Sequence, residues 1–234
     1  METTPFQGVL RDAGPACRRL GLFLAGGCAL RAHGLTDRPV RNLDFAAAGE
    51  IPLPDVAARL AAELRRAGYR VTAGEVTPRL GRLTVEDADG GRAVEVGLLR
   101  EVLRARPLLD GPCPVVGLDD AVGLKVRALH DRGLPRDLVD VAAAAHLYPY
   151  RELERLCALH DEGFSVTELL ARLDGVQLHP DEAYQACGLG GEDVHRIRMF
   201  ALNWAEEIRL RRVEDGDCAA DLFALDEAAP GDED

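Results

Sequence analysis

Two glycines and an aspartate near the N-terminus have the types and the spacing of a phosphate and metal site. The stretch FLAGGCALRAHGLTDRPVRNLDFAAA (23–48) places Gly26-Gly27 between a short apolar run and a helical pattern, and Asp44 on the next predicted strand. Glycine lets a backbone approach a ligand closely, and the free N–H groups that open a helix favour anions. Mg²⁺ prefers carboxylate, water and phosphate oxygens, so Asp44 is a candidate ligand for this metal.

Together these features indicate a site for a nucleoside triphosphate (NTP) and Mg²⁺. Nucleotidyl transfer requires little beyond in-line positioning and charge neutralisation, which such a site supplies. Taken singly, each feature has an ordinary explanation: Gly-Gly at a strand end is usually a turn, and an aspartate on a strand is often an edge residue. The combination is more specific, because Asp44 follows Gly27 by only 17 residues.

A single lysine is the second unusual feature of the sequence. The chain has 28 basic residues, and all of them except Lys125 are arginines. Such a bias is typical of genome composition, and the lysine is either a chance survivor or a residue with a specific role. A compact ammonium and a planar guanidinium are not interchangeable, so Lys125 is a candidate for a role that arginine would fill poorly.

The elements that must position these residues divide the chain into two halves. Short apolar or alternating runs predict strands at 20–25, 42–48, 69–76, 81–88 and 92–99, with a hairpin turn at 87–91. Helical patterns occupy 5–20, 28–34 and 54–68, and Gly14-Pro15 predicts a break in the first of them. From residue 119 onward every pattern is helical, at 119–131, 136–146, 150–162, 165–173, 180–187 and 191–213.

This order of elements predicts an α+β fold, with a mixed sheet and flanking helices followed by an all-helical C-terminal half. We expect a core domain at 1–115, a helical domain at 116–213 that completes the active site, and a tail at 214–234. The tail holds nine acidic residues and no basic one, which is typical of a disordered, solubilising segment. A mimic of nucleic acid or a contact with a partner is the alternative.

Composition and charge exclude several classes of protein. The net charge of -12 argues against a surface that coats nucleic acid generally, although the chain without its tail carries only -3. There is no apolar run long enough for a membrane span and no signal peptide pattern at the N-terminus. The six cysteines are scattered and the histidines show no metal spacing, so we expect reduced thiols in a cytoplasmic protein.

Four motifs in sequence order resemble a known family. They are GGCALRAHG (26–34), RPVRNLDF (38–45), LKVRALHDR (124–132) and PRDLVDV (135–141). Gly26-Gly27-Cys28 followed by the aspartate strand is similar to the signature of the polymerase-β-type nucleotidyltransferase superfamily. The nearer resemblance is to the AbiEii/AbiGii-type nucleotidyltransferase toxins, which include the MenT toxins, and it covers residues 20–146.

The resemblance implies roles for individual residues. Gly26 and Gly27 would contact the triphosphate, and Asp44 would be the principal metal ligand. Lys125 would lie on the phosphates. Asp140, or less favourably Asp137, would complete the site from the next helix.

Two positions depart from the superfamily pattern. Asn42 replaces the first strand carboxylate; its side-chain oxygen can face a metal but brings no charge. Glu95 could supply the missing charge, because strand alternation places Glu95 and Gly97 on the face opposite Val94 and Val96. A solvent-facing glutamate at a sheet edge is the alternative.

Two further residues near the motifs are candidates for nucleotide contact. Arg38 is placed for contact with phosphate or RNA, or is simply a solvated loop arginine. Cys28 occupies the third position of the motif, where serine or threonine is common. It suits a weak hydrogen bond better than a covalent nucleophile, since no base is assigned near it.

The sequence and the resemblance together predict a nucleotidyltransferase that uses Mg²⁺ or Mn²⁺ and moves a nucleoside monophosphate (NMP) from an NTP to an RNA, most simply a tRNA 3′ end. It would be the toxin of a toxin–antitoxin pair, with a cognate antitoxin as its protein partner. Transfer to a small molecule such as an aminoglycoside, or to a protein hydroxyl, is the alternative. A degenerate fold that only binds a nucleotide or a partner is the non-enzyme alternative, and Asn42 is the residue that supports it.

Overall fold

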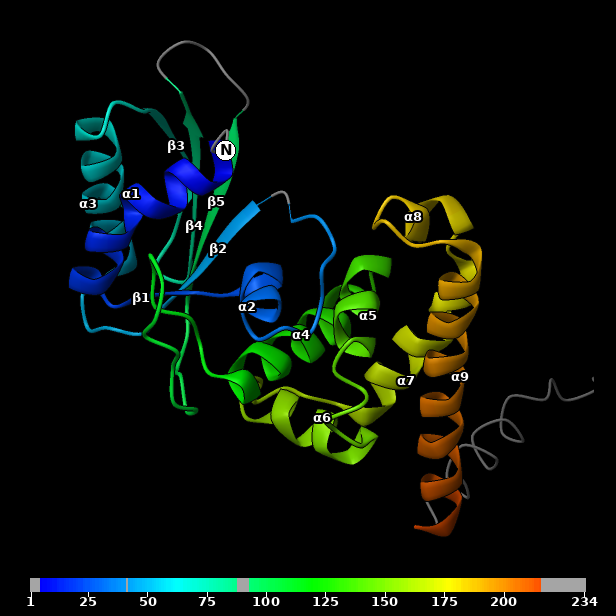
Figure 1. The fold of residues 1–234 in the computed structure, drawn as a ribbon. Coiled ribbons are helices and arrows are strands. Elements are labelled where there is room, and N and C mark those ends of the chain that lie inside the picture. The colour runs from blue at the N-terminus through cyan, green and yellow to red at the C-terminus, as the bar shows by residue number, and fades with distance from the viewer. Residues whose placement is uncertain (1–4, 41, 88–92, 216–234) are drawn as a thin grey trace, which may run out of the picture.

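A mixed five-stranded sheet forms the N-terminal half of the protein (Figure 1). The structure is a computed structural model that describes residues 5–40, 42–87 and 93–215. The strands lie in the order β1 (Leu22–Leu24), β2 (Asn42–Ala47), β5 (Val94–Arg100), β4 (Leu80–Glu86) and β3 (Arg70–Val76). Only β2 and β5 pair in parallel, and the other neighbours are antiparallel. The five predicted strands are therefore confirmed.

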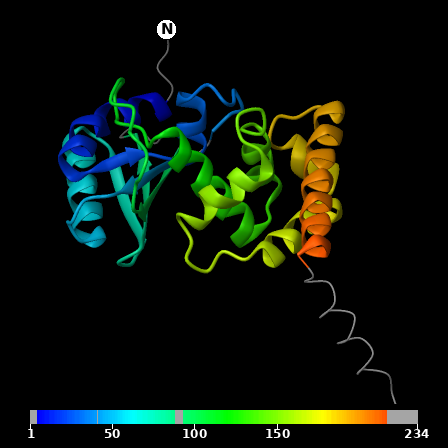
Figure 2. The same ribbon diagram turned by 90° about the horizontal axis from the view of Figure 1, so that it is seen from below.

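Two helices cover one face of this sheet. These are α1 (Pro5–Leu20) and α3 (Leu53–Arg66), which lie side by side in both views (Figures 1 and 2). Alternation along the strands buries one set of side chains beneath them, including Leu43, Val96 and Leu83, which share a row of the sheet. The opposite face carries Asn42, Asp44 and the residues paired with them. Neither α1 nor α3 covers this face.

The predicted break at Gly14-Pro15 is wrong, because α1 runs without interruption through both residues. Pro15 removes one hydrogen bond from the helix, but it lies on the exposed side. Burial of the opposite side of the helix outweighs that loss, since Val9, Ala13 and Cys17 are almost fully buried. Packing of an amphipathic helix on a sheet thus overrides a local breaker signal.

The C-terminal half contains only helices in the residues that the structure describes beyond position 117, as predicted. They are α4 (Leu118–Arg132), α5 (Pro135–Ala142), α6 (Tyr150–Ala158), α7 (Val166–Gly175), α8 (Asp181–Gln185) and α9 (Gly191–Glu214), with a 3₁₀ turn at Val176–Leu178. Three of them end earlier than predicted, α5 at Ala142, α6 at Ala158 and α8 at Gln185. The long α9 packs against α7 at the end of the molecule away from the sheet (Figures 1 and 2).

The two halves meet at α2 (Gly26–Ala32), which follows β1 and packs against α4. The chain between the halves returns beside β1, where Leu24 N–H donates to the Pro114 carbonyl at 2.7 Å and Val116 N–H donates to the Leu24 carbonyl at 3.0 Å. His33 binds the Val116 carbonyl through Nε2 at 2.8 Å. The predicted domain boundary near residue 115 stays a prediction.

Some predictions are tested only in part. Cys17, Cys28, Cys113, Cys157 and Cys187 are free thiols, as expected, while Cys218 lies outside the described residues. The predicted turn at 88–91 and the tail from 216 onward also lie outside them, although β4 and β5 pair as that turn requires. Within the described ranges, no helix has both the length and the apolar character needed to cross a bilayer.

Gly14 allows α1 to approach the loop that precedes α4, and this contact generates the first prediction. A Cβ at position 14 would lie 2.2 Å from the Pro112 carbonyl oxygen, which Arg18 holds in place with a 2.7 Å hydrogen bond. We expect Gly14→Ala to lower the free energy of unfolding by about 1–3 kcal/mol, measured by chemical denaturation. Gly175→Ala is the matched control, because a Cβ there meets no described atom within 4 Å. Equal stability of the two variants would contradict this account.

Candidate active site

Asp44 lies in the middle of β2, on the sheet face that α1 and α3 leave uncovered. Its partner across the parallel pair is Gly97 on β5, and Asn42 is paired with Glu95 in the next row of the same face. Arg82 on β4 continues the row of Asp44 and Gly97. The expectation that Glu95 and Gly97 share a face opposite the buried Val94 and Val96 is therefore confirmed.

Two glycines enclose the carboxylate of Asp44. A Cβ on Gly26 would lie 2.6 Å from Oδ2, and a Cβ on Gly97 would lie 2.6 Å from Oδ1. Gly26 also has a φ of +59°, a conformation that other residues rarely adopt. The first motif glycine is thus required for the turn into α2 and for the close approach of Asp44. Its contact with a triphosphate stays a prediction.

A cavity of about 740 Å³ opens in front of Asp44. Its wall combines the sheet face with the loop after α2, the α4–α5 region and α8. Most predicted site residues lie in this wall, namely Gly27, Arg38, Asn42, Asp44, Glu95, Lys125 and Asp137. Gly26, Cys28 and Asp140 lie behind it. Residues far apart in the sequence therefore converge on one site.

The cavity is positively charged, in contrast to the acidic chain as a whole. Five basic side chains line it, against the three acidic ones of Asp44, Glu95 and Asp137. The basic residues are Arg38, Arg82, Lys125, Arg132 and Arg136. This excess of positive charge suits an anionic ligand such as a triphosphate or a nucleic acid backbone.

Sequence reasoning missed Arg82 and Arg136 as site residues. Strand alternation could have found Arg82, because it lies opposite Gly97 in the pairing of β4 with β5. Arg136 follows the proline that opens α5 and stays exposed at the cavity edge, which no local signal indicates. Neither arginine makes an ion pair with any residue that the structure describes, so both are available to a ligand.

Asp140 connects three segments through ion pairs. Its side chain is fully buried on α5, Lys125 Nζ lies 2.7 Å from Oδ2, and Arg38 approaches with Nε at 2.5 Å and Nη2 at 2.7 Å. Burial alone would raise the pKa of Asp140, but the hydrogen bonds from Arg38 and the charge of Lys125 outweigh it and hold this pKa below 3.8. An acid that is buried among apolar neighbours requires a partner, and Asp140 has two.

Asp137 forms a second buried pair at the cavity wall. It accepts hydrogen bonds from Arg132 Nη2 at 2.7 Å and Nε at 3.1 Å. Arg132 lies two turns after Lys125 and returns to the same side of α4, as the helical period predicts. Arg127 lies off that side and instead binds Glu101.

The pKa of Asp44 shifts in the opposite direction to that of Asp140. Burial raises the pKa of Asp44, and the charges of Lys125, Arg136 and Arg132 reduce this shift without cancelling it. Its carboxylate makes no ion pair with any described residue. A half-buried, uncompensated carboxylate at a cavity wall fits a cation. Asn42 and Glu95 offer further oxygens on the same face, and Glu95 accepts a 3.0 Å hydrogen bond from Thr84.

Cys28 is buried and supports the strand rather than lining the cavity. Its thiol donates to the Asn42 carbonyl over 3.7 Å, and burial raises the pKa of this thiol to about 12. A protonated thiol is a poor nucleophile at neutral pH, in agreement with the expected weak hydrogen bond. Contact of Cys28 with a nucleotide stays a prediction.

The contrast between the two aspartates predicts opposite effects of removing their charges. Folding raises the pKa of Asp44, so its ionised form destabilises the fold and its protonated form does not. Asp44→Asn should therefore raise the free energy of unfolding at pH values above that pKa and change it little at low pH. A carboxylate whose pKa is lowered stabilises the fold above 3.8 and loses this effect as the pH falls. Asp140→Asn should therefore cost about 3 kcal/mol at pH 7 and progressively less below pH 3.8.

Urea unfolding at several pH values measures both effects, with Asp55→Asn on the exposed side of α3 as a control. Destabilisation by Asp44→Asn at pH 7 would contradict the uncompensated charge, and a neutral Asp140→Asn would contradict the ion-pair cluster.

Comparison with known structures agrees with this architecture. A candidate nucleotidyltransferase from H. pylori superimposes with a TM-score of 0.57 at 15% identity, over 89% of this chain and 98% of the other. JHP933 from Helicobacter pylori gives a TM-score of 0.50 at 18% identity, over 93% and 95%. MenT4, a nucleotidyltransferase toxin from Mycobacterium tuberculosis, gives 0.48 at 16% identity, over 87% and 91%. At these identities the likeness to the two Helicobacter proteins concerns the fold alone.

The sequence itself decides the family. No protein with a curated description matches it. The family model described as "Nucleotidyl transferase AbiEii toxin, Type IV TA system" matches residues 18–186, which include all four motifs, α8 and every residue of the cavity wall except Cys187. The chain is a nucleotidyltransferase and belongs to the AbiEii toxin family.

Proposed function

We propose that this enzyme transfers an NMP from an NTP to a hydroxyl of an RNA, with the 3′ end of a tRNA as the favoured acceptor, and that it depends on Mg²⁺ or Mn²⁺. The observation that carries the proposal is the uncompensated carboxylate of Asp44 in a cavity with excess positive charge. The carboxylate suits a divalent cation, and the basic wall suits a triphosphate and an RNA backbone.

In this reaction the acceptor hydroxyl attacks the α-phosphate, a new phosphorus–oxygen bond forms, and pyrophosphate leaves. A divalent cation held by Asp44, with Asn42 and Glu95 on the same face, would supply charge neutralisation for the phosphates and polarise the attacking hydroxyl. Lys125 and the wall arginines neutralise the charge on the leaving group. Because Gly26 and Gly97 confine Asp44, its carboxylate needs little reorganisation.

We assign different roles to Glu95 and Asp140. A base for the acceptor hydroxyl must reach the cavity, which Glu95 does. Asp140 is fully buried and has a lowered pKa because it binds Arg38 and Lys125, so it is a poor base. It acts instead as a positioning residue that holds Lys125. Contributions of the helical half through Lys125 and Asp137 support the proposal that residues 116–213 complete the site.

The alternatives differ in their fit to the cavity. An aminoglycoside is cationic and would meet a wall with excess positive charge, which disfavours it. A protein hydroxyl is the other alternative acceptor, and the assay below distinguishes it from RNA. Family membership also supports a toxin role in the cytoplasm with a cognate antitoxin as partner.

The first test incubates the enzyme with total tRNA, Mg²⁺ and each α-labelled NTP in turn. We expect label on RNA with one NTP, and a loss of about 100-fold or more in Asp44→Ala and Lys125→Ala. Lys125→Arg retains the charge but not the compact shape, so it tests whether lysine itself is needed. Asp55→Ala is the control on the far side of the sheet. Label on protein instead of RNA would move the acceptor to a protein hydroxyl, and no label with any NTP would refute the proposal.

The second test restores the carboxylate that Asn42 replaces. Asn42→Asp places a second charge in the row beside Asp44, so we expect the half-maximal Mg²⁺ concentration for transfer to fall about ten-fold. Calorimetric titration of Mg²⁺ into the same variant measures the affinity independently of activity. The control is Asn203→Asp on the exposed side of α9. An unchanged Mg²⁺ dependence would mean that position 42 does not face the metal.

A further inference from the structure

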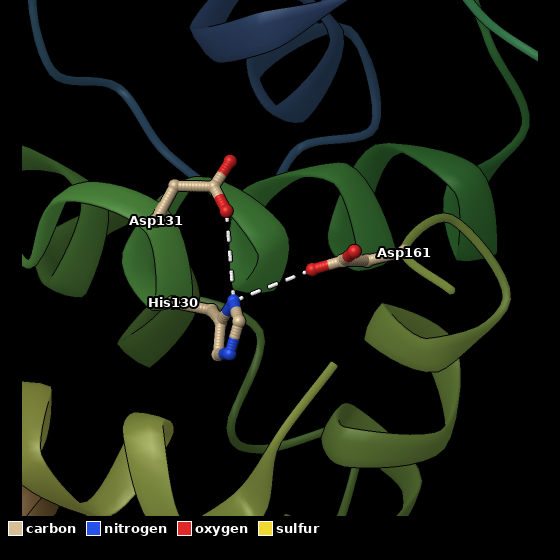
Figure 3. Close-up of side chains that lie close together, drawn as sticks. All are labelled: His130, Asp131 and Asp161. Carbon is tan, nitrogen blue, oxygen red and sulfur yellow. Dashed lines mark ion pairs between the residues drawn. The ribbon is translucent and has the colours of Figure 1, made fainter. Parts of the chain in front are cut away.

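A histidine and two aspartates form a cluster apart from the active-site cavity (Figure 3). His130 and Asp131 end α4, and Asp161 follows α6 in the segment that leads to α7. One donor atom from each of the three lies within 4.8 Å of the others. None of the three lines the cavity around Asp44. Sequence reasoning gave the histidines no metal role, because no second histidine is suitably spaced and Asp161 is distant in the chain.

His130 is buried with one ring nitrogen unsatisfied. Its exposed fraction is 5%, and Nδ1 has no hydrogen-bond partner among the residues that the structure describes. Nδ1 nevertheless points at Asp161 Oδ2, 3.3 Å away, and at Asp131 Oδ1, 3.5 Å away (Figure 3). An unpaired polar atom in a buried ring is costly, so this arrangement calls for a missing partner.

The separations match those of ligands that share one metal ion. Charge-assisted hydrogen bonds between nitrogen and a carboxylate are shorter, at roughly 2.7–2.9 Å. Two ligands bonded at about 2.1 Å to one tetrahedral ion lie roughly 3.4 Å apart. The two distances from His130 Nδ1 agree with the second value.

The surroundings hold these donors in place. On the other side of the ring, the Ser165 N–H donates a 3.3 Å hydrogen bond to Nε2, and Glu168 Oε2 lies 3.2 Å from the same nitrogen. Binding of an ion to Nδ1 would require Nε2 to carry the ring proton and to donate to Glu168 in place of its bond with Ser165. Asp161 accepts a 3.0 Å hydrogen bond from Gly163 N–H through its other oxygen.

We propose that His130, Asp131 and Asp161 bind a first-row transition-metal dication of the Zn²⁺ type. One imidazole and two carboxylates suit such an ion, whereas Mg²⁺ prefers oxygen ligands alone. Asp131 is exposed, with 55% of its side chain accessible, so solvent can reach the ion and complete its coordination. The ion would be structural, because it joins the end of α4 to the α6–α7 connection.

The location gives this ion an indirect influence on catalysis. The same helix carries Lys125 at its middle and Arg132 in its last turn, and both side chains line the active-site cavity. Metal binding would therefore hold the helix from which the proposed phosphate ligand extends, while contributing no group to the reaction. The site stands independently of the proposed RNA acceptor.

The test uses the full-length, tag-free chain after removal of metal by a chelator, in the Asp44→Asn background that disables the active-site carboxylate. Titration with Co²⁺, whose visible absorption reports coordination, and with Zn²⁺ by calorimetry should each give one ion per chain and a higher Tm. His130→Asn and Asp161→Asn should weaken binding about ten-fold or more. His195→Asn on the exposed side of α9 is the matched control and should bind normally.

Asp131→Asn separates a loss of metal binding from a loss of folding, because this exposed side chain can change without disturbing the core. It should also weaken binding at least ten-fold while circular dichroism stays unchanged. Absence of stoichiometric binding, or binding that all three variants retain, would overturn the proposal. In that case the carboxylates of Asp131 and Asp161 only lie beside the His130 ring and hold no ion. Activity is not measured, so failure here is distinguishable from failure of the proposed transfer reaction.

Discussion

The buried ion cluster around Asp140 is the interaction on which the site depends. One fully buried carboxylate binds Arg38 from the loop after α2 and Lys125 from α4, while it belongs to α5 itself. Breaking such a cluster from one side would leave two cations poorly compensated, since the side chains of Arg38 and Lys125 are only 15% and 12% exposed. The N-terminal and helical halves of the enzyme are thereby fixed relative to each other at the cavity.

The two key aspartates show how one fold gives identical side chains different tasks. Asp140 is buried with two cations, so its charge is satisfied and serves to position Lys125. Asp44 is half-buried between two glycines and has no cation in direct contact among the described residues, so its charge is available to a ligand. Solvation and pairing, rather than residue type, separate the positioning residue from the proposed metal ligand.

The charge of the cavity differs in sign from the charge of the chain. The net charge is -12, yet the cavity wall has more basic than acidic side chains. A local field of this kind attracts anionic substrates, while the overall negative charge keeps the protein from coating nucleic acid without discrimination. The cavity lies between the sheet and the helices, so neither half of the chain forms the site alone.

The sequence by itself determined the class of fold, the family and seven of the residues that line the cavity. Gly26-Gly27, Asp44 and Lys125 stood out because their types and local spacing carry chemical information, and strand alternation placed Glu95 and Gly97 on one face. Only the tertiary structure decided which carboxylates are paired, that Arg82 and Arg136 join the wall, and that Pro15 does not interrupt α1. It also brought Asp161 to His130. These outcomes depend on long-range packing and on burial, which set pairing and pKa values and which a local pattern does not encode.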